Sequence, residues 1–397
     1  MANSNLSNAK SGRNDEFYTQ FHDIEKEIAA YLEYNPDVFR GKIVLCPCDD
    51  PYESNFFKYF ALKFNEFGLK KLIATCYAGS PIANRELSLF DEESAETKTT
   101  KSPHKIEITD INNGGAVNLS DVQLLLAQDR NLLTRLKGNG DFRSKEIKQL
   151  RDEADIIITN PPFSLFREFL AWIMEANKQF SIIGNVNAIT YRETFPLLKE
   201  NKIWLGPSIT SGDRKFNVPD DIPLYAAGCG IDEDGKKYIQ VKGVRWFTNI
   251  DHGRRHQPLQ LMTMANNLRY NKKMKGKESY EKYDNYDAIE VPFTDAIPND
   301  YDGIMGVPIT FLDKYSPEQF VILGATQRGC HDEVPDTKKY DDYLEVKQNG
   351  EKTGSSGGKT NENANLVGND GKKNYFTNKE GRIIQSSYQR IFIKHKK

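Results

Sequence analysis

Short apolar runs alternate with segments of helical spacing along the first 250 residues, and this alternation constrains the fold more than any other feature of the chain. The runs predict strands over residues 42–46, 72–77, 105–108, 155–159, 180–184 and 203–205. Between the runs, apolar residues recur every three or four positions, as in the series of Phe56, Phe57, Phe60 and Phe64, which predicts helices. Strands that alternate with helices favour an α/β fold with a mainly parallel sheet that is covered on both faces.

Beyond residue 250 the alternation fades, and the sequence predicts a boundary between two regions, 1–250 and 251–397. The second region contains Tyr- and Asp-rich stretches that have no clear period. Within it, residues 347–381 are rich in Gly, Asn, Lys and Ser. This composition predicts a flexible insertion at the surface rather than packed structure.

The composition is that of a folded, soluble protein. Of the 397 residues, 38% are hydrophobic and 11% are aromatic, which is too many for wholesale disorder. No run approaches the roughly 20 apolar residues of a membrane helix, and the start lacks the apolar core of a secretory signal. We therefore expect a cytoplasmic protein. Its five cysteines fit neither a disulfide framework nor the spacing of a zinc site, so we expect reduced thiols and no structural metal.

The strongest apolar run, residues 155–159, leads directly into Asn160, Pro161, Pro162 and Phe163. Ligands of an open parallel sheet bind beyond the carboxyl ends of its strands, so these four residues should lie in the ligand crevice. A strand-ending turn, a common role for Asn and Pro, is the alternative.

These four residue types suit the methylation of a planar amine such as that of adenine. The amine lone pair is delocalised into the ring, and hydrogen bonds from the two N–H groups to the Asn160 side chain and the Pro161 carbonyl favour a pyramidal, nucleophilic nitrogen. The prolines fix φ near about −65° and donate no hydrogen bond, which keeps both acceptors aligned. Phe163 offers a face on which a base that has left the duplex can stack.

Acidic residues at two further places are candidates for binding a cofactor. Asp49 and Asp50 end the first strand, where an acid can hold an amino group or ribose hydroxyls; a helix N-cap is the alternative for either one. Asp141, with Phe142 beside it, can bind the adenine amine of a cofactor, and a turn is the alternative.

Polar and aromatic groups also crowd together before the first strand, at Asp15, Phe17, Tyr18 and Thr19. The crowding predicts a lid over residues 13–33, and a helix-capping box is the alternative.

The net charge of −2 hides a strongly basic segment. Residues 252–282 contain eight Lys or Arg and two acids. We expect contacts with nucleic acid from Arg254, Arg255, Arg269, Lys272, Lys273 and Lys275. Most charge runs are merely solvated faces, which is the alternative here.

At these residues the chain resembles the EcoRI-type adenine-N6 DNA methyltransferases, the modification enzymes of restriction systems. The resemblance extends over residues 15–20, 49–60, 140–144, 159–166, 185–187, 200–206, 282–289 and 306–312. These long segments are more specific than the tetrapeptide alone, which suits several methyl acceptors. The chain departs from the family in residues 79–102 and in the Gly-, Ser- and Asn-rich stretch after Tyr343.

The resemblance implies a class I methyltransferase fold, with Rossmann-like sheet topology, and S-adenosylmethionine as cofactor. The region of Phe17, Asp49 or Asp50, and Asp141 would surround this cofactor, while Asn160 to Phe163 receive a flipped adenine. It also implies that residues after the sheet read the target in double-stranded DNA. A cognate restriction endonuclease acting on the same site is an implied partner.

Two other kinds of function remain open from the residues alone. One is methylation of RNA or of a protein glutamine amide, because the tetrapeptide serves any planar amine or amide. The other is a non-catalytic DNA-binding subunit that keeps the sheet without turnover.

Overall fold

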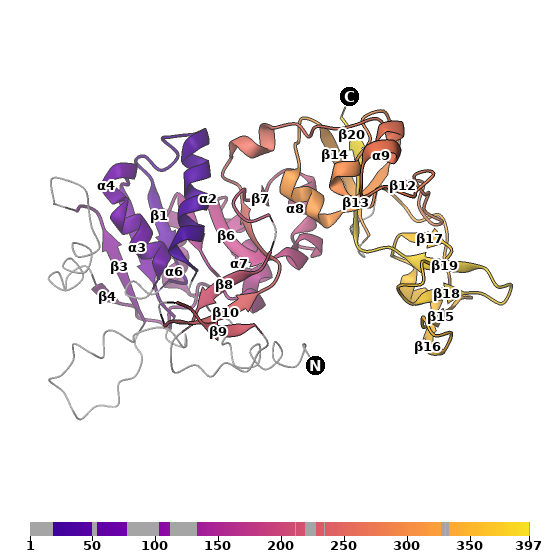
Figure 1. Cartoon of the computed structure of the whole chain (residues 1–397). Coiled ribbons are helices and arrows are strands. Elements are labelled where there is room, and N and C mark those ends of the chain that lie inside the picture. Colours follow the sequence, from indigo (N-terminus) through magenta and orange to yellow (C-terminus); the bar gives the residue numbers. More distant parts are fainter. Residues whose placement is uncertain are drawn as a thin grey trace. The chain divides into compact units, whose positions relative to one another are not determined.

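The computed structural model describes residues 19–49, 54–77, 103–111, 133–210, 212–218, 228–233, 235–326, 330 and 333–396 (Figure 1). The chain forms two compact units, which we call the first unit (Met1–Ala188 and Ile203–Gly253) and the second unit (Ile189–Lys202 and Arg254–Lys397). The main break follows Gly253, close to the boundary at residue 250 that the sequence suggests. The short segment Ile189–Lys202 belongs to the second unit, which nothing in the sequence pattern indicates.

An eight-stranded sheet forms the centre of the first unit. Its strands are β1 (Ile43–Cys46), β2 (Lys71–Thr75), β3 (His104–Ile108), β4 (Leu133–Arg135), β5 (Ile156–Thr159), β6 (Gln179–Asn185), β7 (Trp204–Leu205) and β11 (Val244–Thr248). They lie in the order β4-β3-β2-β1-β5-β6-β11-β7. The central strands β2, β1, β5 and β6 are parallel, with Val44 beside Ile156 and Thr159 beside Ile182.

The prediction of a mainly parallel sheet is wrong outside this centre. The pairings that involve β3, β4, β7 and β11 are antiparallel, so the sheet is mixed. The burial of β3 explains its different direction: His104, Ile106 and Ile108 are buried while the residues between them are partly exposed. Such alternation is typical of antiparallel strands, whereas β1 and β5 are buried at every position, as in a parallel core.

Helices cover both faces of this sheet (Figure 1). On one face, α2 (Phe21–Tyr34), α3 (Asn55–Leu62) and α4 (Phe64–Phe67) share a core with alternate residues of β1 and β5. α6 (Lys145–Glu153) and α7 (Phe166–Glu175) supply buried residues of their own, and the Phe166 ring of α7 lies 5.0 Å from that of Phe247 in β11. The Ser54 side chain caps α3 by accepting hydrogen bonds from the backbone of Phe56 and Phe57.

A buried glutamate fixes α2 in this unit. Glu27 is fully buried, accepts a hydrogen bond of 2.5 Å from the Tyr31 hydroxyl and another of 3.0 Å from the backbone of Ser208. A side chain at Gly206 would collide with it, since an added Cβ would lie 1.8 Å from a Glu27 oxygen. Residues 21–33 of the predicted lid are therefore part of a packed helix, and residues 13–18 lie outside the described residues.

A small antiparallel sheet completes the first unit. Its strands are β8 (Arg214–Asn217), β9 (Cys229–Ile231) and β10 (Lys237–Val241), in the order β8-β10-β9. Two 3-10 helices follow strands of the large sheet, η2 (Phe163–Leu165) and η3 (Val186–Thr190).

The second unit contains two mostly antiparallel sheets. The four-stranded sheet has the order β12-β13-β20-β14 and the five-stranded sheet has the order β16-β15-β18-β19-β17. The strands are β12 (Ile289–Glu290), β13 (Met305–Pro308), β14 (Phe320–Ala325), β15 (Leu344–Val346), β16 (Lys352–Ser356), β17 (Asn365–Val367), β18 (Tyr375–Thr377), β19 (Ile383–Ser386) and β20 (Arg390–His395). The helical elements are α8 (Phe195–Lys199), η4 (Gly253–His256), α9 (Met264–Tyr270), η5 (Thr294–Ala296), η6 (Ile309–Lys314) and η7 (Gly357–Thr360).

The structure also corrects the interpretation of residues 347–381 as a segment without packed structure. This range contains β16, β17 and β18. Tyr340, Tyr343, Phe376 and Ile384 form a small core beneath these strands. Three of these four residues lie outside residues 347–381, so the composition of that range alone does not indicate the strands.

No helix within the described ranges has both the length and the apolar character that crossing a membrane requires.

Candidate active site

The carboxyl ends of the parallel strands bring several predicted residues to one edge of the large sheet. Asp49 follows β1, Asn160 follows β5, and Asn185 ends β6. The backbone N–H of Asp49 donates to the carbonyl of Thr75 at 3.1 Å, which joins the ends of β1 and β2. The first unit thus has polar side chains at the edge where ligands of parallel sheets bind.

The Asn160 loop leaves β5 in a restrained conformation. Asn160 is buried, with 8% of its surface exposed. The Pro162 carbonyl accepts a hydrogen bond from Leu165 N at 2.9 Å and so starts η2, whereas in the part of the chain that the structure describes no hydrogen bond reaches the Pro161 carbonyl. The Phe163 ring is half-buried and lies edge-to-face with Phe216 of β8, with ring centroids 6.4 Å apart. The loop therefore combines a buried amide, an available carbonyl and a partly open aromatic ring.

Asp49 connects this loop to the helix that follows β1. Its carboxylate is 6% exposed and accepts hydrogen bonds from the Ser54 hydroxyl at 2.6 Å and from the Thr159 hydroxyl at 2.5 Å. Ser54, rather than Asp49, is the N-cap of α3, so the N-cap alternative does not hold for Asp49. Asp50 lies outside the described residues. Neither Ser54 nor Thr159 was singled out from the sequence, because hydroxyl residues at strand and helix ends are too common to be noticed.

Thr19 is buried beside the start of α3. It is 4% exposed, and its carbonyl accepts a hydrogen bond of 2.7 Å from the Asn55 side chain. Among the described residues its own hydroxyl has no hydrogen-bond partner, which is costly for a buried polar group. Gln20 is the N-cap of α2 and makes no side-chain cap, so Thr19 does not begin a capping box there. Asp15, Phe17 and Tyr18 lie outside the described residues.

The loop that carries Asp141 passes close to the end of β2. Gly140 has a φ of +76°, and an added Cβ would lie 2.1 Å from the Cys76 carbonyl, so only glycine fits there. The Asp141 carboxylate pairs with the Arg143 guanidinium at 2.7 and 2.8 Å. This hydrogen bonding raises the pKa of Arg143 above its ordinary value. Arg143 also reaches Glu168 of α7 at 2.9 Å.

Phe142, predicted to lie beside the cofactor, is packed against α7. Its ring is 5% exposed and packs edge-to-face against Phe169 and Trp172 of α7, at centroid distances of 5.1 and 5.6 Å. The physical reason is the apolar face of α7, which needs an aromatic partner. We therefore treat Phe142 as a core residue that holds the Asp141 loop.

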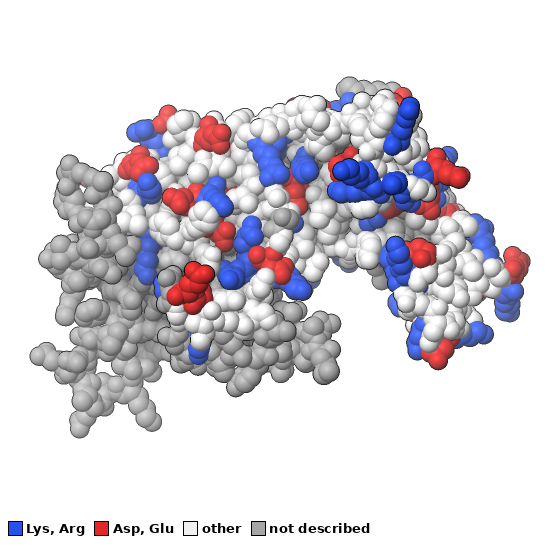
Figure 2. All heavy atoms as spheres, in the orientation of Figure 1, with Lys and Arg blue, Asp and Glu red and all other residues white. Residues whose placement is uncertain are grey.

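The basic residues of the second unit differ in their exposure. Arg269, Lys272, Lys273 and Lys275 are exposed, and Figure 2 shows Lys and Arg gathered on the part of this unit around α9. Arg269 lies over the Tyr270 ring at 5.1 Å, and Lys273 pairs with Asp295 at 2.9 Å. Arg255 is instead 6% exposed and donates to the Asn201 side chain at 2.6 Å. Its predicted contact with nucleic acid is not supported, because Asn201, distant in sequence, holds it inside the unit.

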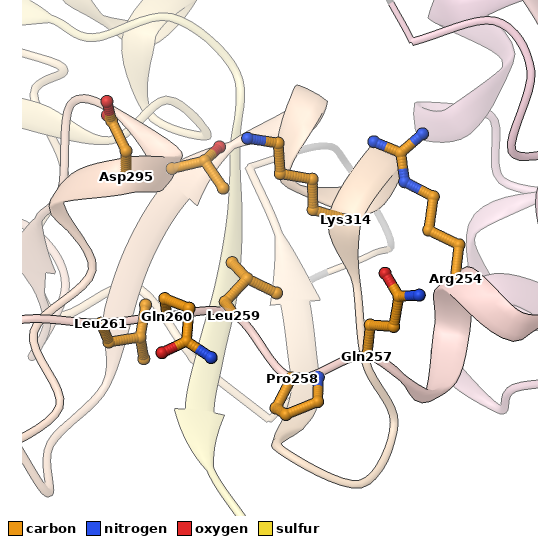
Figure 3. A pocket seen from close by; sticks show the side chains of 9 residues that line it. Arg254, Gln257, Pro258, Leu259, Gln260, Leu261, Asp295 and Lys314 are labelled. Atoms are coloured by element: carbon orange, nitrogen blue, oxygen red, sulfur yellow. The ribbon is translucent and has the colours of Figure 1, made fainter.

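A pocket lies next to the remaining predicted cation, Arg254. It has a volume of about 330 Å³. Its lining residues are Arg254, Gln257, Pro258, Leu259, Gln260, Leu261, Thr294, Asp295 and Lys314 (Figure 3). Lys314 lies outside the basic segment 252–282, so the charge pattern of the sequence does not indicate it.

Comparison with known proteins identifies the family of the chain. A sequence profile described as "Adenine-specific methyltransferase EcoRI" matches residues 5–396. The type II methyltransferase M.EcoRI of Escherichia coli is 45% identical over 319 residues, which cover 80% of this chain and 88% of that protein. The chain belongs to the EcoRI methyltransferase family.

Two further relatives of the EcoRI family come from mycoplasmas. The type II methyltransferase M.MpnI of Mycoplasma pneumoniae is 36% identical over 318 residues, covering 79% of this chain and 83% of that protein. M.MgeORF184P of Mycoplasma genitalium is 34% identical over 317 residues, covering 79% and 84%. No solved structure matches the chain. Membership of the EcoRI family confirms the prediction of a site-specific DNA methyltransferase and does not favour the RNA, protein-glutamine or non-catalytic alternatives.

Proposed function

We propose that this chain transfers a methyl group from S-adenosylmethionine to the N6 amine of an adenine that has flipped out of duplex DNA. The observation that carries the proposal is the Asn160 loop, which places a buried amide and an available carbonyl at the carboxyl end of β5 in a member of a methyltransferase family.

The first unit has the features of a class I methyltransferase domain, and we assign it that role. Its central strands are parallel, helices cover both faces, and the polar residues collect at the carboxyl edge. We assign target recognition to the second unit, whose exposed cations suit the backbone of DNA. We also propose action in the cytoplasm, and the resemblance of the sequence implies a restriction endonuclease with the same recognition site as partner.

The Asn160 loop acts on the adenine amine. The Asn160 amide oxygen and the Pro161 carbonyl accept its two N–H groups, which localises the lone pair on nitrogen. Phe163 stacks on the base, and the stacking offsets part of the few kcal/mol that unstacking costs. Because these acceptors are fixed before the substrate arrives, they need no reorganisation during the reaction.

The bound cofactor supplies a methyl group on a positively charged sulfur, so the reaction needs alignment more than a strong base. Several features of the first unit fit such a group. The buried Thr19 hydroxyl can bond a polar atom of the cofactor, and the carboxylate of Asp141 lies in the loop beside the end of β2. The resemblance adds Asp15, Phe17, Tyr18 and Asp50 as further cofactor contacts.

Exposed cations of the second unit contact DNA phosphates in this proposal. The exposed residues Arg269, Lys272, Lys273 and Lys275 and the half-buried Arg254 fill this role, and Arg255 does not, because it is buried. A phosphate contact adds affinity and register without reading the sequence.

Transfer of a labelled methyl group tests the proposal directly. The protein is incubated with S-adenosylmethionine labelled in the methyl group and with duplex DNA, RNA or a protein mixture in parallel. We expect label in DNA alone, recovered as N6-methyladenine after digestion to nucleosides. Label in RNA or protein with none in DNA would overturn the proposal.

A further inference from the structure

The pocket between the segment 254–261 and the elements η5 and η6 has the properties of an anion site. Two cations, Arg254 and Lys314, line it (Figure 3). Lys314 is exposed and, within the described residues, makes no ion pair. The acid in the lining, Asp295, is paired with Lys273 at 2.9 Å, so it offsets little of this positive charge.

Hydrogen-bond donors and apolar groups complete the lining. Gln257, Gln260 and Thr294 carry side chains that can donate to an oxygen, and Pro258 and Leu259 present apolar surface. This combination matches a phosphate group together with the carbon face of the sugar attached to it. The volume of about 330 Å³ is large enough for both groups.

The wall of the pocket is held in place before any ligand binds. The Gln319 side chain accepts from the backbone of Leu259 at 2.8 Å and donates to the carbonyl of the same residue at 3.1 Å. The Asn299 side chain donates to the Leu261 carbonyl at 3.2 Å, and its backbone donates to Met262. A wall fixed by such bonds loses little conformational entropy when it binds an anion.

We propose that this pocket binds one backbone phosphate, with its sugar, of the DNA substrate. In this contact Lys314, which lies outside the basic segment 252–282, adds its positive charge to that of Arg254. The proposal rests on the proposed function, because it takes duplex DNA as the ligand. It assigns a contact to Lys314, Gln257 and Thr294, and it places Arg254 in the lining beside the same phosphate.

The salt dependence of DNA binding tests this pocket. Dissociation constants for a fluorescent duplex that contains the methylated sequence are measured by anisotropy at several salt concentrations. We expect Lys314→Gln to weaken binding and to reduce the slope of log K against log salt by about 1, as expected for one lost phosphate contact. Thr294→Val should weaken binding without changing the slope, since it removes a neutral donor. Lys352→Gln in β16 is the matched control, since it removes an exposed lysine far along the chain.

The outcomes separate the two proposals. A wild-type protein that neither binds nor methylates DNA would contradict the proposed function itself. If the wild type binds DNA normally and Lys314→Gln leaves the salt slope unchanged, only the proposal about the pocket is overturned. An equal change of the slope in Lys352→Gln would overturn it as well. If Lys314→Gln loses affinity for inorganic phosphate but not for DNA, the pocket holds a free anion and the proposal also fails.

A second observation, in the first unit, concerns Asp49. Both of its carboxylate oxygens are already used, one by Ser54 at the start of α3 and the other by Thr159 at the end of β5. Thr159 is fully buried and directly precedes Asn160. At 2.5 Å the bond from Thr159 has the length of a charge-assisted hydrogen bond, so it fixes the residue from which the Asn160 loop begins.

We infer that Asp49 is a positioning residue for the Asn160 loop, acting through Thr159, rather than a ligand of the cofactor. The inference rests on the proposed function, since the loop is taken as the adenine site. A shift of the loop origin misaligns the two acceptors at Asn160 and Pro161, which lowers the rate of transfer without touching the cofactor.

Thr159 provides a clean test, because valine has nearly the same shape and lacks the hydroxyl. We expect Thr159→Val to lower the single-turnover rate of methyl transfer at least about 10-fold. The cofactor dissociation constant of this variant should stay within a factor of about two of the wild-type value. Thr159→Ser, which keeps the hydroxyl, should have close to the wild-type rate. Asp49→Asn, which keeps a single acceptor oxygen, should show the same pattern and serves if Thr159→Val does not fold. An unchanged rate in these variants, or cofactor affinity that falls in step with the rate, would overturn the inference. A wild type without transfer activity would contradict the proposed function instead.

Discussion

The polar side chains at the edge of the large sheet and a charged pair in the second unit are buried in different ways. In the first unit, Thr19, Asp49 and Asn160 are buried at the carboxyl edge of a sheet, and Asp49 accepts hydrogen bonds from the hydroxyls of Ser54 and Thr159. In the second unit, Glu290 and Arg390 are buried between strands and bind each other at 2.5 Å. Two buried charges that bind each other are costly to separate, whereas polar groups gathered at the carboxyl edge of a parallel sheet lie where ligands bind. The difference supports our proposal that the reaction takes place in the first unit and that the exposed cations of the second unit bind DNA.

The comparison is tested most strongly by breaking the buried pair of the second unit. Arg390→Met leaves the Glu290 carboxylate buried without its main partner, and we expect a loss of about 3–5 kcal/mol in the free energy of unfolding. The double variant Glu290→Met with Arg390→Met should recover most of this loss. Urea denaturation measures both. A loss below about 1 kcal/mol, the value of an exposed pair, would show that this pair is not the structural support that the comparison assumes.

In the first unit, removal of a buried polar group should affect turnover more than stability. Asn160→Ala removes one acceptor of the adenine amine, and we expect the turnover number to fall about 100- to 1000-fold, as when one oriented partner of a transition state is lost. The dissociation constant for S-adenosylmethionine and the melting temperature should stay close to those of the wild type. Gln149→Ala, which removes an exposed amide on α6, is the control and should retain most activity. Near-normal turnover in Asn160→Ala would remove the assigned role.

A pH experiment sharpens the comparison within the five-stranded sheet of the second unit. The Lys359 side chain, 2.8 Å from Glu345, lowers the pKa of this carboxyl to about 2 by hydrogen bonding. A depressed pKa adds stability that is complete above the unfolded value of about 4.3 and is lost as the pH falls towards 2. Because Lys359 is exposed, we expect only about 1–2 kcal/mol.

The measurement compares urea unfolding of the wild type and of Glu345→Gln at pH 7 and pH 3. The difference between the two proteins should shrink at the lower pH. Glu351→Gln, which breaks an exposed pair with Lys347, is the control and should leave the free energy of unfolding nearly unchanged at either pH, because solvent screens such a pair. A difference for Glu345→Gln that is independent of pH would assign its role to packing instead of charge.

The strands and site residues that depend on local sequence pattern could be predicted from the sequence. Continuous apolar runs predicted β1, β5 and β6, and the position of Asn160 followed from the end of one such run. The direction of β3 and the burial of Arg255 could not be predicted in the same way. Both depend on partners distant in sequence: β2 for the strand and Asn201 for the arginine.

Dependence on partners distant in sequence also explains which contacts of the site and which strands of the second unit could not be predicted. Asp49 was predicted as a site residue because an acid at the end of the first strand can hold an amino group or ribose hydroxyls, but its bond to Thr159 spans 110 residues. The strands of residues 347–381 were hidden because their core comes largely from Tyr340, Tyr343 and Ile384 outside that range. Polar, glycine-rich composition describes the turns of short hairpins as well as it describes a flexible segment.

The smallest expected effect concerns Thr19, whose hydroxyl is the least explained of the buried polar groups at the first unit's edge. Thr19→Val keeps the shape and the backbone bond to Asn55, and it removes the hydroxyl. If the cofactor uses this hydroxyl, its dissociation constant should rise about 5- to 10-fold, the value of one hydrogen bond. The free protein should be as stable as the wild type or slightly more stable, since a buried group without a described partner is gone. Thr19→Ser should bind normally. Equal cofactor affinity in Thr19→Val would make Thr19 a packing residue. The contrast between the edge of the large sheet and the buried pair of the second unit would then depend on Asp49 and Asn160.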